Sequence, residues 1–188
     1  MIPVRPVKLE DGSWFDTREY DQGNPVRNQK ENTHKNRINN FYGTADVGYT
    51  IIDGLEAKVL LAKSRNTEDE SKYSSIESQA GYNDGGKAER WSRLRDKDLM
   101  EWTANYSAEF NKHKINALIG YSWEEENYEE THVQTRGFVT DLLGANNLAA
   151  GQNLNPGDAE SQKWQSRLIS LYARAVSYTH LTLPTIRL

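Results

Sequence analysis

The sequence contains no cysteine among its 188 residues. This absence excludes a disulfide framework and any metal or redox site built on thiolates. Its longest apolar run is 59–62, and because a membrane-spanning helix requires roughly 20 apolar residues, we expect none. The first twenty residues lack an apolar segment, so no signal peptide is expected there. A net charge of −4 argues against a broad nucleic-acid-binding face.

The chain combines a polar average with many aromatic residues. Its mean hydropathy is −0.85, yet it has 10 Tyr, 5 Trp and 4 Phe. Disordered chains usually contain few aromatics. A transmembrane β-barrel has this mixture, because its strands alternate apolar and polar residues, its loops are polar and aromatics line the membrane interfaces. The composition is therefore compatible with a barrel.

Alternation of polar and apolar residues predicts two β-hairpins. The first spans 39–64, with a tight-turn signal at Asp53-Gly54. The second spans 101–124, with a turn at 111–114. Each predicted strand has about ten residues, which is the length that crosses a bilayer at a tilt.

Less regular segments flank these hairpins. We expect an irregular extracellular loop segment over 1–38, barrel strands and loops over 39–175, and a fifth strand from Trp164 to Arg174. Within that region, 65–98 and 127–163 are predicted to be long polar insertions. Short and long connections thus alternate, as they do between the periplasmic and extracellular ends of outer-membrane barrels.

These observations predict an all-β fold, a partial antiparallel transmembrane β-barrel with long extracellular loops. The alternative is a soluble extracellular β-sheet domain that binds carbohydrate. A hydrolase domain has little support, because no motif places paired carboxylates. The last segment, 176–188, does not continue the pattern, since Pro184 interrupts it without a turn signal. It resembles a translated sequencing-adapter peptide, and we expect it not to be native.

Several stretches together resemble the SusC/RagA class of TonB-dependent outer-membrane transporters. The order and spacing of the stretches carry the resemblance, which extends over about 20–175. The stretches are 39–49, 52–55, 99–106, 113–124, 136–141, 146–148 and 165–174.

The resemblance implies a role in transport and no enzymatic activity or cofactor. The family's fold is a barrel of 22 strands with an N-terminal plug, so a chain with five strands would be a fragment of it. The family imports glycan or peptide fragments across the outer membrane of Gram-negative bacteria, here of the Bacteroidota. Its partners are TonB, a SusD-like surface lipoprotein, the oligosaccharide or peptide ligand and outer-membrane lipid, with no nucleic acid.

Alternation assigns side chains to the two faces of the predicted wall. Apolar and aromatic residues in phase with Ala and Ile are predicted to face lipid or to form the aromatic girdle: Trp102, Tyr106, Ile119, Tyr121 and Trp123. For the four aromatic residues of this set, a platform on which sugar rings stack is the alternative. Polar residues in the opposite phase are predicted to face the lumen: Glu101, Thr103, Asn105, Asn116 and Glu124. Aromatic residues of the predicted loops are candidate ligand or partner contacts, with packing of the loops as the alternative: Tyr73, Tyr82, Trp91 and Phe138.

No catalytic or metal-binding residue is predicted. The four histidines are scattered, without an HExxH motif or an i,i+4 pair. Glutamates crowd at 124–126, 129 and 130, but alternate side chains of a strand point in opposite directions, so these carboxylates should not converge on one ion.

Overall fold

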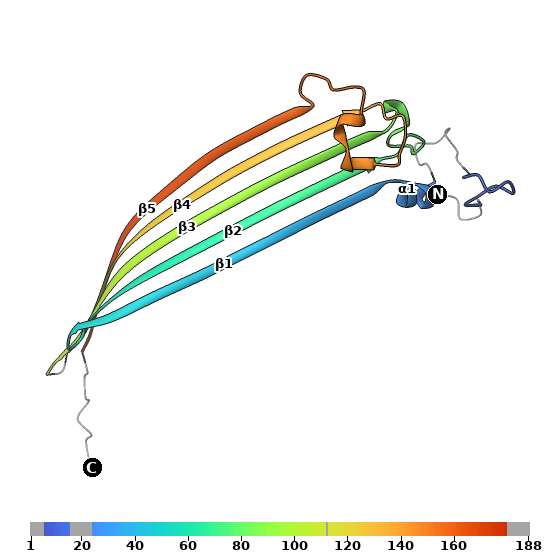
Figure 1. Cartoon of the computed structure of the whole chain (residues 1–188). Coiled ribbons are helices and arrows are strands. Elements are labelled where there is room, and N and C mark those ends of the chain that lie inside the picture. Colours follow the sequence, from blue (N-terminus) through green and yellow to red (C-terminus); the bar gives the residue numbers. More distant parts are fainter. Residues whose placement is uncertain (1–5, 16–23, 112, 180–188) are drawn as a thin grey trace, which may run out of the picture. The chain divides into compact units, whose positions relative to one another are not determined.

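One sheet dominates the computed structural model, which describes residues 6–15, 24–111 and 113–179. Its strands follow one another in the order β1-β2-β3-β4-β5 (Figure 1). Their bounds are Thr33–Ile52 for β1, Leu55–Ser74 for β2, Lys87–Phe110 for β3, His113–Arg136 for β4 and Ala159–Thr179 for β5. Each strand pairs with the next one along the chain, and the connections return the chain in the opposite direction. The predicted all-β antiparallel fold is confirmed.

Helical structure is short in the described part of the chain. It consists of the helix α1 (Pro25–Glu31) and three 3-10 turns, η1 (Tyr82–Asp84), η2 (Gly144–Asn146) and η3 (Leu148–Ala150). Asn24 caps α1, because its side-chain oxygen accepts hydrogen bonds from the backbone N–H groups of Val26 and Arg27. None of the described helices has the length and apolar character needed to cross a membrane.

The strands are much longer than the sequence predicted. They contain 20 to 24 residues, so most of the predicted insertion 65–98 is strand, and β4 continues to Arg136. Of the two predicted insertions, only 75–86 and 137–158 remain as connections between strands. The strand ends escaped prediction because both of their faces are polar, which leaves no alternation to detect. Cross-strand ion pairs stabilise them instead, such as Arg93 Nη1 to Glu70 Oε2 at 3.1 Å.

The two ends of the chain also differ from expectation. In place of irregular structure throughout 1–38, the structure has α1 and the first residues of β1. At the other end, 176–179 continue β5, whereas 180–188 lie outside the described residues. The non-native origin of 176–188 stays a prediction.

The chain divides into two compact units. The first contains 1–39, 66–94 and 129–163, and the second contains 40–65, 95–128 and 164–188. Every strand contributes residues to both units.

The first unit has a small hydrophobic core beneath the connection 137–158. It consists of Tyr73, Ala88, Phe138 and Ala145, and the rings of Tyr73 and Phe138 meet edge to face with centroids 5.3 Å apart. Asp141 fastens the connection to β2, because its Oδ1 accepts hydrogen bonds from the Tyr73 hydroxyl at 2.6 Å and from the Ile76 N–H at 2.9 Å. The connection is therefore ordered by packing and by specific hydrogen bonds.

The second unit contains the tight turn between β1 and β2. Gly54 adopts a positive φ of 80°, and a Cβ there would lie 2.2 Å from the Ser107 carbonyl oxygen. This close approach requires glycine, and the Ser107 N–H in turn donates to the Gly54 carbonyl at 2.7 Å. The tight turn predicted at Asp53-Gly54 is confirmed. His113 and Lys114, which the sequence predicted in the second turn, lie in β4.

Candidate ligand-facing and membrane-facing surfaces

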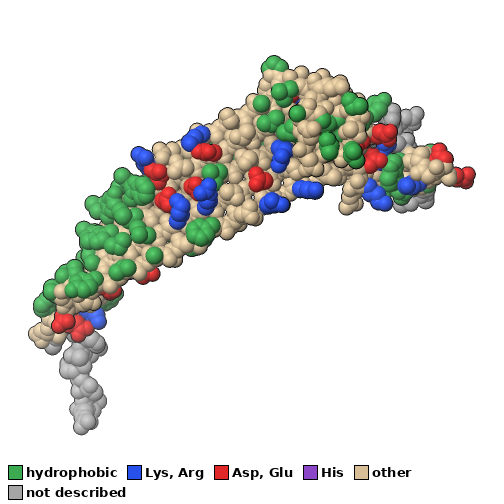
Figure 2. All heavy atoms as spheres, viewed as in Figure 1, with side chains coloured by type: hydrophobic (Ala, Val, Ile, Leu, Met, Phe, Trp, Pro, Cys, Tyr) green, Lys and Arg blue, Asp and Glu red, His purple; other side chains and the backbone are tan. Residues whose placement is uncertain are grey.

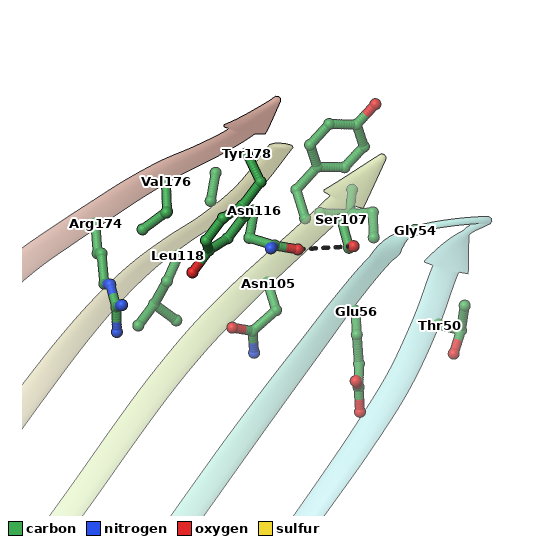
Figure 3. A pocket seen from close by; sticks show the side chains of 13 residues that line it. Thr50, Gly54, Glu56, Asn105, Ser107, Asn116, Leu118, Arg174, Val176 and Tyr178 are labelled. Atoms are coloured by element: carbon green, nitrogen blue, oxygen red, sulfur yellow. Dashed lines mark hydrogen bonds between the residues drawn. The ribbon is translucent and has the colours of Figure 1, made fainter. Parts of the chain in front are cut away.

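A polar hollow lies on one face of the second unit, which we call the Asn105 face. Its volume is about 530 Å³, and Figure 3 shows side chains of all five strands around it. Thr50, Asn105 and Tyr178 bring hydrogen-bonding groups to it, whereas Leu55, Leu118 and Val176 bring apolar ones. The Ser107 hydroxyl donates to Asn116 Oδ1 at 2.8 Å. Glu56 and Arg174 add one charge of each sign. This lining suits water and polar ligands rather than hydrocarbon.

Cross-strand ion pairs continue the polar character of the Asn105 face. Lys97 Nζ lies 2.7 Å from Glu124 Oε1, and Arg95 Nε lies 3.3 Å from Glu126 Oε1. Both pairs are partly exposed, so each contributes at most about 1 kcal/mol to stability. Each pair joins one cation and one carboxylate, so the pairs make this face polar without adding net charge to it.

The opposite face of the second unit, the Trp102 face, is apolar. The large hydrophobic side chains on it are substantially exposed in every strand, and Figure 2 shows hydrophobic side chains gathered on the second unit. They include Phe41, Val47, Tyr49, Leu61, Trp102, Tyr106, Phe110, Ile115, Ile119, Ile169 and Leu171. A continuous surface of this kind is unfavourable in water and marks contact with protein or membrane.

Charged residues limit the Trp102 face at one end. Lys63 Nζ lies 2.8 Å from Asp98 Oδ1, two positions beyond Leu61 on β2. On β5, Arg167 pairs with Glu125 of β4, two positions before Ile169. The apolar surface therefore ends in a row of ion pairs, which is the boundary expected where hydrocarbon gives way to a polar medium.

The structure separates the two sets of residues to which alternation assigned opposite environments. Residues two apart on a strand share a face, so Glu101, Thr103 and Asn105 lie on the Asn105 face, together with Asn116 and Glu124 of β4. The set predicted to face lipid lies on the Trp102 face: Trp102, Tyr106, Ile119, Tyr121 and Trp123. Which medium each face meets stays a prediction.

In the first unit, Arg93 is the centre of a charge network that joins three strands. Its guanidinium contacts Glu70 of β2 at 3.1 Å and Glu130 of β4 at 3.1 Å. Glu70 also pairs with Lys72 at 2.8 Å and with His34 of β1 at 2.9 Å. Hydrogen bonds from Lys72, Arg93 and His34 lower the pKa of Glu70 to about 2. The Glu70 carboxylate therefore stays ionised over the physiological range.

Trp91 lies beside this network, in β3 rather than in a loop. Its ring stacks on His132 of β4, with centroids 4.4 Å apart and planes 7° apart. The Lys72 ammonium lies 4.6 Å from its ring centroid. These contacts tie Trp91 into the sheet, so its predicted loop position is wrong.

The predicted ligand contacts at Tyr73 and Phe138 need correction. Their side chains are 3% and 6% exposed in the core of the first unit, so they are not accessible to a ligand. Burial and the hydrogen bond to Asp141 raise the pKa of the Tyr73 hydroxyl. Tyr73 lies in β2 rather than in a loop, whereas Phe138 lies in the connection 137–158 and packs against Tyr73. Tyr82 lies in η1 with an exposed side chain.

Arg136 and Asp158 close the base of the connection 137–158. The Asp158 carboxylate is buried and accepts hydrogen bonds from Arg136 Nη1, from Gln134 Nε2 and from the Asn155 N–H, each at 2.7 Å. The hydrogen bond from the Asn155 N–H, followed by those from Arg136 and Gln134, lowers the pKa of Asp158. The sequence contained no signal for this contact, because its members are separated by loop residues.

The glutamates at 124–126 diverge, as alternation predicted. Glu124 and Glu126 pair with Lys97 and Arg95 on the Asn105 face, whereas Glu125 pairs with Arg167 on the other face. Among the described residues, no group of three or more His, Asp or Glu is placed to hold a metal ion.

An aromatic pair on the Asn105 face was missed in the sequence. Tyr128 of β4 and Trp164 of β5 stack with ring centroids 5.3 Å apart and planes 23° apart. The Arg95 guanidinium lies 5.4 Å from the Tyr128 ring. Tyr128 was assigned to an insertion, and the mixed pattern of β5 concealed the facing of Trp164. A strand prediction extended by four residues would have placed Tyr128 in phase with Asn116.

The chain has relatives among proteins of known name. TonB-dependent receptor P3 of Formosa agariphila is 27% identical over 161 residues, which cover 85% of this chain and 16% of the receptor. TonB-dependent receptor P26 of the same organism is 25% identical over 158 residues, which cover 79% of this chain and 16% of that receptor. No family model matches the chain.

Solved structures share the fold. The RagAB peptide transporter superposes with a TM-score of 0.73 at 16% identity, over 90% of this chain and 19% of the matched chain. The RagAB peptide importer in its "open-open" state gives a TM-score of 0.72 at 17% identity.

The predicted resemblance to SusC/RagA-type TonB-dependent transporters is confirmed. It extends over most of the chain, both in sequence and in fold. The chain spans about one-sixth of the length of these receptors, 16% in each case.

Proposed function

We propose that this chain forms part of the wall of an outer-membrane β-barrel transporter dependent on TonB. The observation that carries the proposal is the contrast between the two faces of the second unit. One face exposes large apolar side chains from all five strands, and the other surrounds a polar hollow. A barrel wall needs this contrast, because its outside meets hydrocarbon and its inside meets water.

The apolar face has no cover among the described residues of the second unit, where no hydrophobic side chain is buried. A soluble β-sheet domain would require a second layer on that face. In a bilayer, lipid supplies the cover, and further strands pair with the outer edges of β1 and β5. The five strands would then be a portion of a barrel of 22.

In this proposal the intact protein imports glycan or peptide fragments. A SusD-like surface lipoprotein would deliver the ligand, and TonB would energise its passage. The first unit, with its ordered connections 75–86 and 137–158, would lie on the extracellular side, and the Asn105 face would line the lumen. Support comes from the similarity to TonB-dependent receptors and from the shared fold with the RagAB peptide transporter.

Collision accessibility of paired spin labels tests which face meets lipid. Ile119 and Leu118 are neighbours on β4, and Leu118 lines the polar hollow. The chain has no cysteine, so Ile119→Cys and Leu118→Cys each introduce one labelling site into it. In the intact transporter reconstituted in bilayers, we expect the label at 119 to collide with oxygen and the label at 118 with a water-soluble nickel complex. Equal accessibility at the two sites would contradict the proposal.

A further inference from the structure

Trp164 is an exposed aromatic side chain on the Asn105 face. It is 40% exposed, and it lies in phase with Arg174, which lines the polar hollow. Aromatic residues on the Trp102 face have an explanation in contact with lipid. Contact with lipid does not explain the exposure of Trp164, because its side chain lies on the Asn105 face.

The surroundings of Trp164 form a built platform. Tyr128 stacks against it, and Arg95 lies against the Tyr128 ring. Arg95 is itself held by Glu126 at 3.3 Å. Lys97 and Glu124 form a second ion pair two positions along the same two strands. Two aromatic rings therefore lie beside two cations and two carboxylates.

We propose that Trp164 and Tyr128 form a subsite for a neutral sugar ring of the transported ligand. This inference rests on the proposed function, which makes the Asn105 face the lumenal one. A sugar ring has apolar C–H faces, which pack on aromatic rings, and hydroxyl groups at its rim, which donate and accept hydrogen bonds. The platform offers both kinds of contact, with Arg95 and Lys97 as donors and Glu124 and Glu126 as acceptors.

Charge favours a neutral sugar over a peptide at this place. Each cation beside the platform is already paired with a carboxylate, so the four groups carry no net charge. A peptide terminus or a charged side chain would have to break one of these pairs to find a partner. Hydroxyl groups can join paired ions without displacing them.

Binding to the intact transporter, purified in detergent, tests the subsite. The probes are cellohexaose, laminarihexaose and maltohexaose, with a tryptic digest of casein as the peptide probe, and affinity is measured by calorimetry. Trp164→Ala should weaken binding of a hexasaccharide about tenfold, which is a loss of about 1.4 kcal/mol, because it removes the larger ring of the platform. Trp164→Tyr should retain most of the affinity. Trp123→Ala, on the opposite face, is the matched control and should leave it unchanged.

The outcomes separate this inference from the proposed function. Unchanged hexasaccharide affinity in Trp164→Ala, with the loss confined to thermal stability, would mean that Trp164 only packs in the wall. A wild-type transporter that inserts in the membrane yet binds only casein peptides, or none of the probes, would also overturn the subsite. Either result leaves the proposed function standing. Equal accessibility of the spin labels at 118 and 119 would overturn the proposed function itself.

Discussion

The two units of this chain share the same five strands but follow opposite rules of burial. The first unit buries Tyr73, Ala88, Phe138 and Ala145 beneath an ordered connection. In the second unit no described hydrophobic side chain is buried, and Leu171 is 77% exposed. A polar environment explains the first arrangement, because the hydrophobic effect drives apolar side chains inward. The second arrangement is unfavourable in water, and the proposed function explains it by contact of the Trp102 face with lipid.

The hydrogen-bonding groups show the same contrast. In the first unit, charged groups gather into networks on several strands, such as that of Arg93 with Glu68, Glu70 and Glu130. On the Trp102 face, ion pairs occur at its limit, at Lys63 and Arg167. The same strands thus carry charged networks in the first unit and an apolar face in the second unit. Within the second unit, alternation along each strand places the apolar side chains on the Trp102 face and the polar side chains on the Asn105 face.

The largest expected effect concerns the second unit in the absence of a membrane. Residues 20–175 expressed alone should aggregate in plain buffer and require detergent, because the Trp102 face and both sheet edges are uncovered. Size-exclusion chromatography with light scattering measures this. A monomer that melts cooperatively without detergent would contradict the barrel interpretation.

In the first unit, loss of a core ring should be the most damaging substitution. Phe138→Ala removes the partner of Tyr73 and should destabilise the local fold by about 3–5 kcal/mol. Hydrogen exchange in the intact protein should then show lost protection in 137–158. The neighbouring Val139→Ala is the control, since Val139 is 79% exposed and its truncation should change protection little.

A charge introduced on the two faces of β4 should act unequally. Ile119→Arg places a cation on the Trp102 face and should destabilise the intact barrel by roughly 2–4 kcal/mol. Leu118→Arg, on the Asn105 face, should be milder because water can solvate the guanidinium there. Denaturant unfolding in detergent or lipid compares the two variants, and equal destabilisation would show that the assignment of the faces is wrong.

The smallest expected effect is a pH dependence of the first unit. The Glu70 pKa is lowered to about 2 from 4.5, so its carboxylate stabilises the fold above about pH 4.5. This contribution declines as the pH falls from 4.5 and is lost below about 2. Lys72→Met removes the leading cause and should raise the Glu70 pKa, as followed by carboxyl carbon NMR. The control is Lys87→Met. Lys87 pairs with Glu89, so this substitution should leave the Glu70 pKa unchanged.

Prediction from sequence succeeded where one face of a strand was apolar. Alternation around Trp102 and Ile119 identified both hairpins, and Gly54 identified the first turn. Prediction failed where both faces were polar, as at Arg93 and Glu130, because strands held by cross-strand ion pairs leave no periodic signal. Tyr73 and Phe138 were placed in loops, and only the folded connection shows that they pack together.

By itself, the sequence determined the all-β class, the position of the turn at Asp53-Gly54 and the two opposite faces of the sheet, because strand periodicity is a local property of the chain. Tertiary structure alone decided which side chains meet across strands. The stack of Tyr128 on Trp164, the Arg93 network and the pairing of Arg136 with Asp158 all join residues far apart in sequence. Their contacts depend on strand register and on the path of the connections, which no local pattern specifies.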